Sequence, residues 1–145
     1  MPSLGEIVKG KIVRFIDEGK TVLEAAEYMD KHNVGAVPVL NGDRLVGIFS
    51  ERDLMRRCVT KKLDMAATKV EEVMTERVIV MEASDSYEDC LRIMKQENIR
   101  HIPVIDGDKL VGVISIRDLM QVDMDEKEQK IDILNSYIHY NPKGV

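Results

Sequence analysis

The chain has 145 residues, of which 44% are hydrophobic and 32% are charged, and it carries a formal net charge of −5. This length fits one compact unit with its own hydrophobic core and leaves no room for a large multidomain enzyme. The acidic balance argues against nucleic acid as the main partner, because binding to a phosphate backbone requires an excess of Lys and Arg. Trp is absent and aromatic residues make up only 4%, so an aliphatic core with many of the nine Met is expected.

No apolar stretch approaches the roughly 18 residues that a membrane span requires. The N-terminus lacks the apolar stretch of a secretory signal, so we expect a cytoplasmic protein with no membrane partner. Cys58 and Cys90 match neither zinc-ligand spacing nor a disulfide framework. His32, His101 and His139 show no metal-ligand spacing either, and no metal site is predicted.

Residues 21–55 and 86–120 align without a gap, which shows that one unit occurs twice. The offset is constant, since Pro38 and Pro103, like Asp53 and Asp118, stand 65 positions apart. Two copies are too few for a solenoid. We therefore expect two similar subdomains packed about a pseudo-twofold axis.

Each copy is predicted to begin with a short strand and an amphipathic helix. The strands are expected at residues 12–16 and 78–81. The helices start after Thr21 and Ser86, each followed three positions later by a carboxylate, which is the spacing of a capping box. Apolar residues then recur at i, i+3, i+4 and i+7, which predicts one buried helix face. These residues are Val22, Ala25, Ala26 and Met29 in the first copy, and Tyr87, Cys90, Leu91 and Met94 in the second.

A β-hairpin is predicted after each of these helices. Asn41-Gly42 and Asp106-Gly107 stand between apolar runs, which is the strongest local hairpin signal. The runs are almost continuously apolar, so both faces of each sheet are expected to be covered. Pro38 and Pro103 have no N–H to donate and indicate an edge, a strand start or a bulge. The four strands are expected at residues 36–40, 44–49, 102–105 and 109–114.

A second helix is expected from Glu51 in the first copy and from Ile116 in the second. Residues 123–140 are highly charged but carry Ile131, Leu134 and Ile138 at helical spacing, which predicts a terminal amphipathic helix that docks on another surface. The predicted class is α/β (α+β), with each copy running β-α-β-β-α. The expected parts are residues 1–62, residues 63–122 and a C-terminal helical tail at residues 123–145.

The candidate binding residues lie where each hairpin meets the following helix. Ser50 and Asp53, like Ser115 and Asp118, have capping-box spacing, and such a junction needs no ligand to explain it. The same position also suits a nucleoside phosphate. The free N–H groups and positive dipole end of a helix N-terminus favour phosphate, and a carboxylate can accept hydrogen bonds from a ribose diol. Both interpretations stay open at this point.

Basic residues near these junctions are the second component of the candidate site. Arg52 and Arg117 neutralise phosphate if they point toward it, and are solvated otherwise. Arg100 and His101 stand at the start of an apolar strand. They are interpreted either as phosphate contacts or as surface residues. The first copy has Gly35-Ala36 at the equivalent positions, so unequal sites are expected. No nucleophile elbow, P-loop or dinucleotide fingerprint occurs, and no catalytic residue is predicted.

The ordered motifs resemble a pair of cystathionine-β-synthase (CBS) domains, also called a Bateman module. An A-x-x-x-M helix, an h-P-V strand, a G-D-[RK]-L-V-G hairpin arm and an S-x-x-D junction carry the resemblance over about residues 4 to 121. The V-x-x-V-M-T stretch at residues 70–75 and the E-R-D-L after the first hairpin fit as well. The C-terminal L-N-S-Y-I resembles the tail of CBS-pair proteins that consist of the pair alone.

The resemblance implies a regulatory ligand in the cleft between the two domains. AMP, ADP or ATP is the first expectation, followed by S-adenosylmethionine or NAD(H). Since Gly35-Ala36 lacks the basic pair, one well-equipped site is expected rather than two. Carried onto this sequence, the family's pattern assigns ribose to Asp53 and Asp118, phosphate to Ser50, Ser115, Arg52, Arg117, Arg100 and His101, and the base to the surroundings of Val37, Pro38, Ile102 and Pro103.

Three hypotheses follow for function. The first is a ligand-sensing module, paired as a homodimer, that changes the angle between its halves or its assembly state and acts on an unidentified target protein. The alternative is a ligand-independent adaptor that docks through the C-terminal helix. An enzyme is set aside, because the catalytic barrel that accompanies such pairs in some relatives needs about 250 residues.

Overall fold

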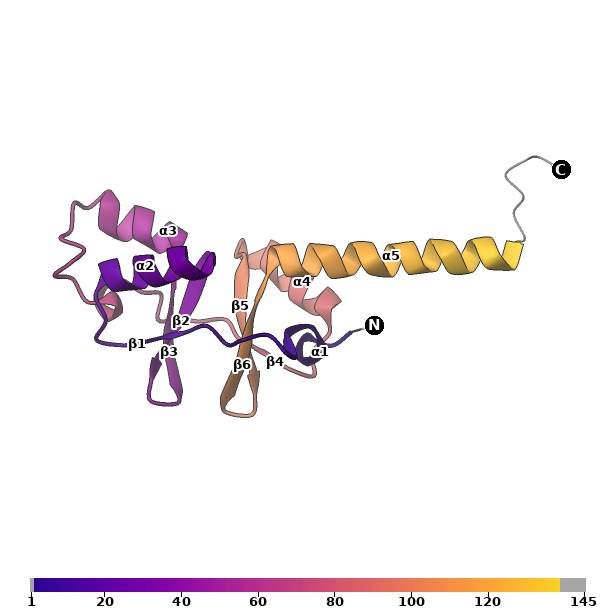
Figure 1. Ribbon diagram of the computed structural model, residues 1–145, viewed down its shortest axis with the longest axis horizontal. Coiled ribbons are helices and arrows are strands. Elements are labelled where there is room, and N and C mark those ends of the chain that lie inside the picture. Colours follow the sequence, from indigo (N-terminus) through magenta and orange to yellow (C-terminus); the bar gives the residue numbers. More distant parts are fainter. Residues whose placement is uncertain (1, 139–145) are drawn as a thin grey trace.

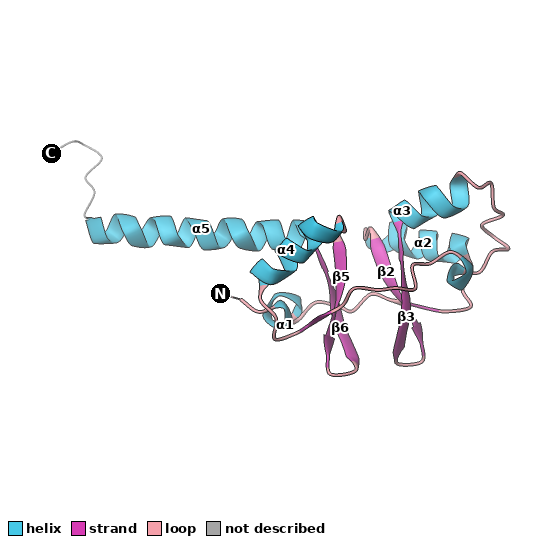
Figure 2. Cartoon of the chain, turned by 180° about the vertical axis from the view of Figure 1, so that it is seen from behind, coloured by secondary structure: helices cyan, strands magenta, loops and turns pink. Residues whose placement is uncertain are grey.

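The computed structural model describes the backbone of residues 2–138 and the side chains of residues 2–134. Two similar halves lie side by side with their hairpin turns pointing the same way, and a long C-terminal helix extends beyond them (Figures 1 and 2). The elements are α1 (Leu4–Val8), β1 (Ile16–Asp17), α2 (Val22–His32), β2 (Ala36–Asn41), β3 (Arg44–Ser50), α3 (Glu51–Asp53) with a π-helical continuation (Leu54–Val59), a 3-10 turn (Val70–Glu72), β4 (Met81–Glu82), α4 (Tyr87–Glu97), β5 (His101–Asp106), β6 (Lys109–Ser115) and α5 (Ile116–Ile138).

Each half contains one three-stranded sheet, in the orders β1-β2-β3 and β4-β5-β6, which confirms the predicted mixed α/β class. The first strand is parallel to the second, and the second is antiparallel to the third. The strands expected at residues 12–16 and 78–81 are shorter and later, because only Ile16–Asp17 and Met81–Glu82 pair with a neighbour. The residues before them run between the two halves and have no strand partner.

The hairpins form as predicted, but their turns lie one residue later than expected. Asn41 pairs with Arg44, and Asp106 pairs with Lys109, so the turn residues are Gly42-Asp43 and Gly107-Asp108. Gly42 and Gly107 both have φ of +62°, a conformation that glycine adopts without a Cβ penalty. A register shift within each hairpin, between Val39 and Leu40 in the first, accompanies this placement.

Pro38 lies in a central strand rather than at an edge, and the ladder accommodates it. Its register partner Ile48 directs its N–H and C=O to Thr75 instead, at 2.9 Å each. The missing N–H of the proline therefore removes no bond to Ile48. The register shift one residue further on agrees with the predicted bulge.

The helix caps follow the sequence prediction. Thr21 and Glu24 form a reciprocal capping box at the start of α2, and Ser86 accepts from the Asp89 N–H at the start of α4. Of the expected buried faces, Val22, Ala25 and Met29 are buried in α2, and Tyr87, Cys90 and Met94 in α4, whereas Ala26 and Leu91 are half-buried. The second half ends in one helix, α5, where two were expected. Residues 139–145, which include the predicted helix end at Tyr140, lie outside the described residues.

Two separate hydrophobic cores hold the halves, and the chain passes between them twice. Leu4 and Val8 of α1 pack in the core of the second half, although they precede the first sheet. Val70, Val73 and Met74 pack in the core of the first half. Residues 9–15, here the N-terminal crossover, therefore join the second core to β1. Residues 75–80, the central crossover, join the first core to β4.

Candidate functional site

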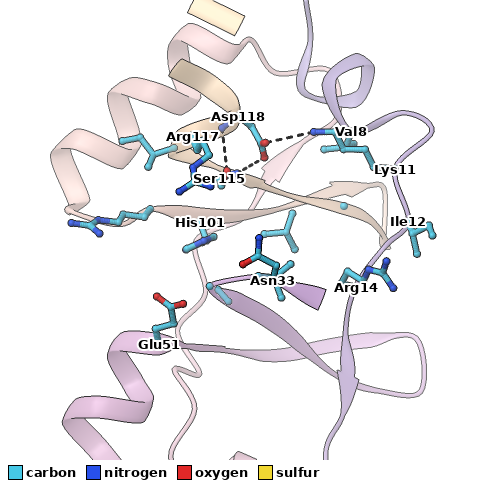
Figure 3. Close-up of a pocket in the computed structure, with 17 residues that line it drawn as sticks. Val8, Lys11, Ile12, Arg14, Asn33, Glu51, His101, Ser115, Arg117 and Asp118 are labelled. Atoms are coloured by element: carbon cyan, nitrogen blue, oxygen red, sulfur yellow. Dashed lines mark hydrogen bonds and ion pairs between the residues drawn. The ribbon is translucent and has the colours of Figure 1, made fainter. Parts of the chain in front are cut away.

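A cavity of about 560 Å³ lies between the two halves, and three parts of the chain line it (Figure 3). The first half supplies residues 33–36 and Glu51, and the N-terminal crossover supplies Lys11, Ile12 and Arg14. The second half supplies the start of β5, part of β6 and the start of α5. A molecule bound here would contact both halves and the segment that joins them.

The junction of β6 and α5, here the second junction, lies at the cavity wall. The Ser115 N–H donates to Asp118 Oδ2 at 3.0 Å, and the Asp118 N–H donates to Ser115 Oγ at 3.1 Å, which is the predicted capping interaction. Asp118 Oδ1 lies 3.6 Å from Lys11 Nζ, and the Asp118 side chain is 31% exposed. One carboxylate oxygen thus serves the helix cap, while the other has a solvent-exposed lysine as its ion-pair partner.

The cavity is positively charged although the chain is acidic. Lys11, Arg14, Arg100 and Arg117 line it together with only two carboxylates, those of Glu51 and Asp118, which leaves a surplus of two positive charges. This surplus in a chain of net charge −5 favours an anionic ligand.

His101 lies between the halves and is a half-buried titratable group of the cavity. Burial lowers its pKa, and the neighbouring Glu51 and Asp118 carboxylates only partly oppose that effect. Gly35 faces it, because a Cβ at Gly35 would stand 3.2 Å from the imidazole. The sequence suggested that Gly35 marks a missing basic residue; the structure shows that it also makes room for His101 from the other copy.

The apolar side chains of the cavity are not those that the sequence indicated. Val37, Pro38, Ile102 and Pro103 are all buried and none of them lines the cavity. The apolar lining consists of Val8, Ile12, Val34, Ala36, Val113 and Ile116. Ile12 is 72% exposed, so it leaves an open apolar surface beside the basic residues.

The junction of β3 and α3, here the first junction, differs sharply from the second. Asp53 accepts hydrogen bonds from the Ser50 N–H and hydroxyl at 3.1 Å each and from the Thr75 hydroxyl at 3.2 Å. Arg57 Nε lies 3.7 Å from Asp53 Oδ1, and the Asp53 side chain is only 10% exposed. This carboxylate is saturated by groups of the protein itself.

Of the twelve predicted site residues, five line the cavity: Arg100, His101, Ser115, Arg117 and Asp118. Ser50 and Asp53 serve the first junction, and Arg52 donates to the Asn98 carbonyl across the halves at 3.2 Å. Sequence reasoning missed Lys11, Ile12 and Arg14, because they precede the repeat and reach the cavity only through the crossover.

The tandem halves match the family model described as "CBS domain" at residues 4–60 and 70–125. The chain belongs to the CBS-domain family. The CBS domain-containing protein YhcV of Bacillus subtilis is 33% identical over 129 residues, covering 89% of this chain and 91% of YhcV. The solved CBS domain NE2398 is 32% identical with a TM-score of 0.79, and the match covers 84% of this chain and 97% of NE2398. The CBS-domain protein ATU1752 of Agrobacterium tumefaciens is 27% identical with a TM-score of 0.77, at 83% and 98% coverage.

The CBS pair of protein MJ0100 shares the fold, with a TM-score of 0.77 at 23% identity over 87% of this chain and 98% of MJ0100. That pair was crystallised in complex with 5′-methylthioadenosine and S-adenosylmethionine. In this CBS pair, none of the described helices is long and apolar enough to cross a membrane. Among the described side chains, no group of three or more His, Cys, Asp or Glu is placed to hold a metal ion.

Proposed function

We propose that this CBS pair is a regulatory module that binds an adenine nucleotide, AMP, ADP or ATP, in the cavity between its halves. The observation that carries the proposal is the second junction, where a partly exposed Asp118 carboxylate, paired with Lys11, lines the same cavity as three arginines. A ribose diol needs the carboxylate and a phosphate needs the cations. S-adenosylmethionine has a cationic sulfonium and gains less from this charge, while NAD(H) is larger than the mononucleotides.

Each part of the nucleotide has a group that suits it. Asp118 Oδ1 accepts hydrogen bonds from the ribose hydroxyls. Ser115, Arg117 and the N-terminus of α5 face the phosphates, and Arg100 and His101 stand beside them, because His101 is the register partner of Ser115. The base lies against apolar side chains of the cavity such as Ile12 and Val113, rather than beside the buried prolines.

We propose one nucleotide site in each chain. Asp53 has four contacts from the protein and does not line the cavity, so a ligand at the first junction would have to displace Thr75 and Arg57. Displacing these partners from a buried carboxylate costs free energy that the open second junction does not require. This single site agrees with the unequal copies that Gly35-Ala36 predicts.

The signal is proposed to be a change in the relative position of the halves or in assembly. A ligand shifts such an equilibrium only by its difference in affinity for the two arrangements, and contacts to both halves supply that difference. No step of this mechanism requires a catalytic residue. The output passes to an unidentified target protein or to the chain's own oligomer.

A homodimer is proposed through the second helix of each half. Met55 and Val59 are 52% exposed each, and Met120 and Met124 are 56% exposed each. The two pairs are 65 positions apart, the offset of the repeat, so the second helix of each half carries an exposed apolar pair. Two copies of the chain can bury these surfaces against one another about a twofold axis.

The test replaces Asp118 with Ala, and uses Asp132→Ala on the same helix as the matched control. Thermal shift and calorimetry are measured with AMP, ADP, ATP, S-adenosylmethionine and NADH. A ligand at 100 times its Kd adds about 2.7 kcal/mol to the stability of the wild type. We expect Asp118→Ala to lose this shift while Asp132→Ala keeps it. Unchanged affinity in Asp118→Ala contradicts the site, and no shift with any compound contradicts the function.

The adaptor remains the second candidate, because α5 extends beyond the two halves (Figure 1) and carries exposed apolar side chains there. Ile131, Ile133 and Leu134 are 57%, 55% and 58% exposed. For an adaptor, deletion of residues 123–145 abolishes assembly or partner binding, and nucleotides have no effect on either.

A further inference from the structure

The two crossovers are attached to the two junctions in different ways. Thr75 of the central crossover exchanges two backbone hydrogen bonds with Ile48 at 2.9 Å each, and its hydroxyl donates to the buried Asp53. At the second junction the attachment is the Lys11–Asp118 ion pair at 3.6 Å, with the Lys11 side chain 55% exposed. Within residues 2–138, no backbone hydrogen bond joins the N-terminal crossover to β6.

We infer that Lys11 adds to the preference of the cavity for a nucleotide over a nucleoside, beyond the basic residues already proposed for the phosphate, and that the ligand acts through Lys11 on the N-terminal crossover. The inference rests on the proposed nucleotide site. Lys11 Nζ lies beside Asp118 Oδ1, the oxygen proposed for the ribose hydroxyls. A bound ribose therefore displaces the ammonium from this oxygen.

What happens to the displaced ammonium depends on the phosphate. In a nucleotide complex the ammonium exchanges the carboxylate for a phosphate oxygen in the same cavity, so the cation keeps an anionic partner. In a nucleoside complex the ion pair is broken and nothing replaces it. An exposed ion pair contributes little to stability, so either ligand can displace it, but only the phosphate restores an attachment for the crossover.

The position of the crossover gives this exchange a consequence for the whole chain. It joins α1, which packs in the second core through Leu4 and Val8, to β1 at the edge of the first sheet. Figure 3 shows Lys11, Ile12 and Arg14 along one side of the cavity, opposite His101 and Glu51. A phosphate bound to Lys11 therefore holds the connection between the halves and orders the crossover.

The experiment compares Lys11→Met with Lys9→Met, an exposed lysine of the same crossover that does not line the cavity. Affinities for AMP and for adenosine are measured by calorimetry, and hydrogen exchange of residues 9–15 is followed with each compound. We expect Lys11→Met to lower the AMP-to-adenosine affinity ratio about tenfold, the effect of one charge-assisted hydrogen bond. AMP should slow exchange in the wild type and in Lys9→Met, but not in Lys11→Met.

Lys11→Arg keeps the charge and is expected to retain most of the preference for AMP. If Lys11→Met leaves the AMP-to-adenosine affinity ratio unchanged, whether or not both affinities fall, the role of Lys11 is overturned and the nucleotide site still stands. If the wild type binds neither compound, the proposed function fails and the inference fails with it.

Discussion

Replacing Asp53 with Asn tests whether the first junction is a structural interaction rather than a ligand site. The Asp53 carboxylate accepts three kinds of donor, from the Ser50 N–H, the Ser50 hydroxyl and the Thr75 hydroxyl, and only 10% of its side chain is exposed. Asn removes the charge and places an NH₂ group among these donors. Since bonds to a charged group contribute about 1.5–3 kcal/mol, we expect a loss of about 2–3 kcal/mol in the free energy of unfolding.

Asp118→Asn is the matched control, because Asp118 occupies the equivalent position in the second copy. Its side chain is 31% exposed, and its partners among the described side chains are the Ser115 cap and a loose ion pair with Lys11. The expected loss is about 1 kcal/mol or less, within the range for a weakened helix cap and an exposed ion pair. The effect on nucleotide affinity should be the reverse of the effect on stability. Affinity should fall in Asp118→Asn and remain near the wild-type value in Asp53→Asn.

The assay is urea denaturation followed by circular dichroism. With an m-value of about 2 kcal/mol/M, the midpoint should fall by about 1 M or slightly more in Asp53→Asn and by about 0.5 M or less in Asp118→Asn. Thr75→Val, which removes one hydroxyl donor without changing the shape, should give part of the Asp53→Asn effect. Equal midpoint shifts in the two Asn variants would refute the difference between the junctions that the structure shows.

Two further predictions concern proton uptake and assembly. Burial lowers the pKa of His101, so the imidazole is neutral near neutral pH, and a phosphate dianion favours its protonated form. The ratio of wild-type to His101→Gln affinity for AMP should therefore rise as the pH falls from about 7.5 to about 6.5; a ratio independent of pH argues against a phosphate contact. For assembly, Met55→Glu with Met120→Glu should convert a dimer into a monomer in size-exclusion chromatography with light scattering, whereas Ile133→Glu on the projecting part of α5 should not. A dimer that survives the double substitution excludes this interface.

Local patterns accounted for most of the fold. The capping residues Thr21 and Ser86 start helices where predicted, and the hairpins form around the Gly of each turn. These features depend on neighbours in the sequence, so they can be recognised without tertiary information. The extents of β1 and β4 were wrong, because strand length depends on which residues find a partner in another segment.

Of the candidate site, the sequence located the second junction and the basic pair at the start of β5, both of which line the cavity. It predicted the base near Val37, Pro38, Ile102 and Pro103, whose side chains are buried and do not line the cavity, and the position of the base stays a prediction. An apolar residue in a strand looks the same in the sequence whether it faces a core or a cleft. Only the packing of the halves separates these two environments.

The sequence by itself determined that the chain is one unit built twice, with a capped carboxylate junction in each copy, because repeats and caps are properties of neighbouring residues. Only the tertiary structure decided that one junction is saturated and the other accessible. That difference depends on Thr75 at the first junction and Lys11 at the second. Both lie in crossovers outside the repeat, and they reach the junctions only because the chain passes twice between two cores.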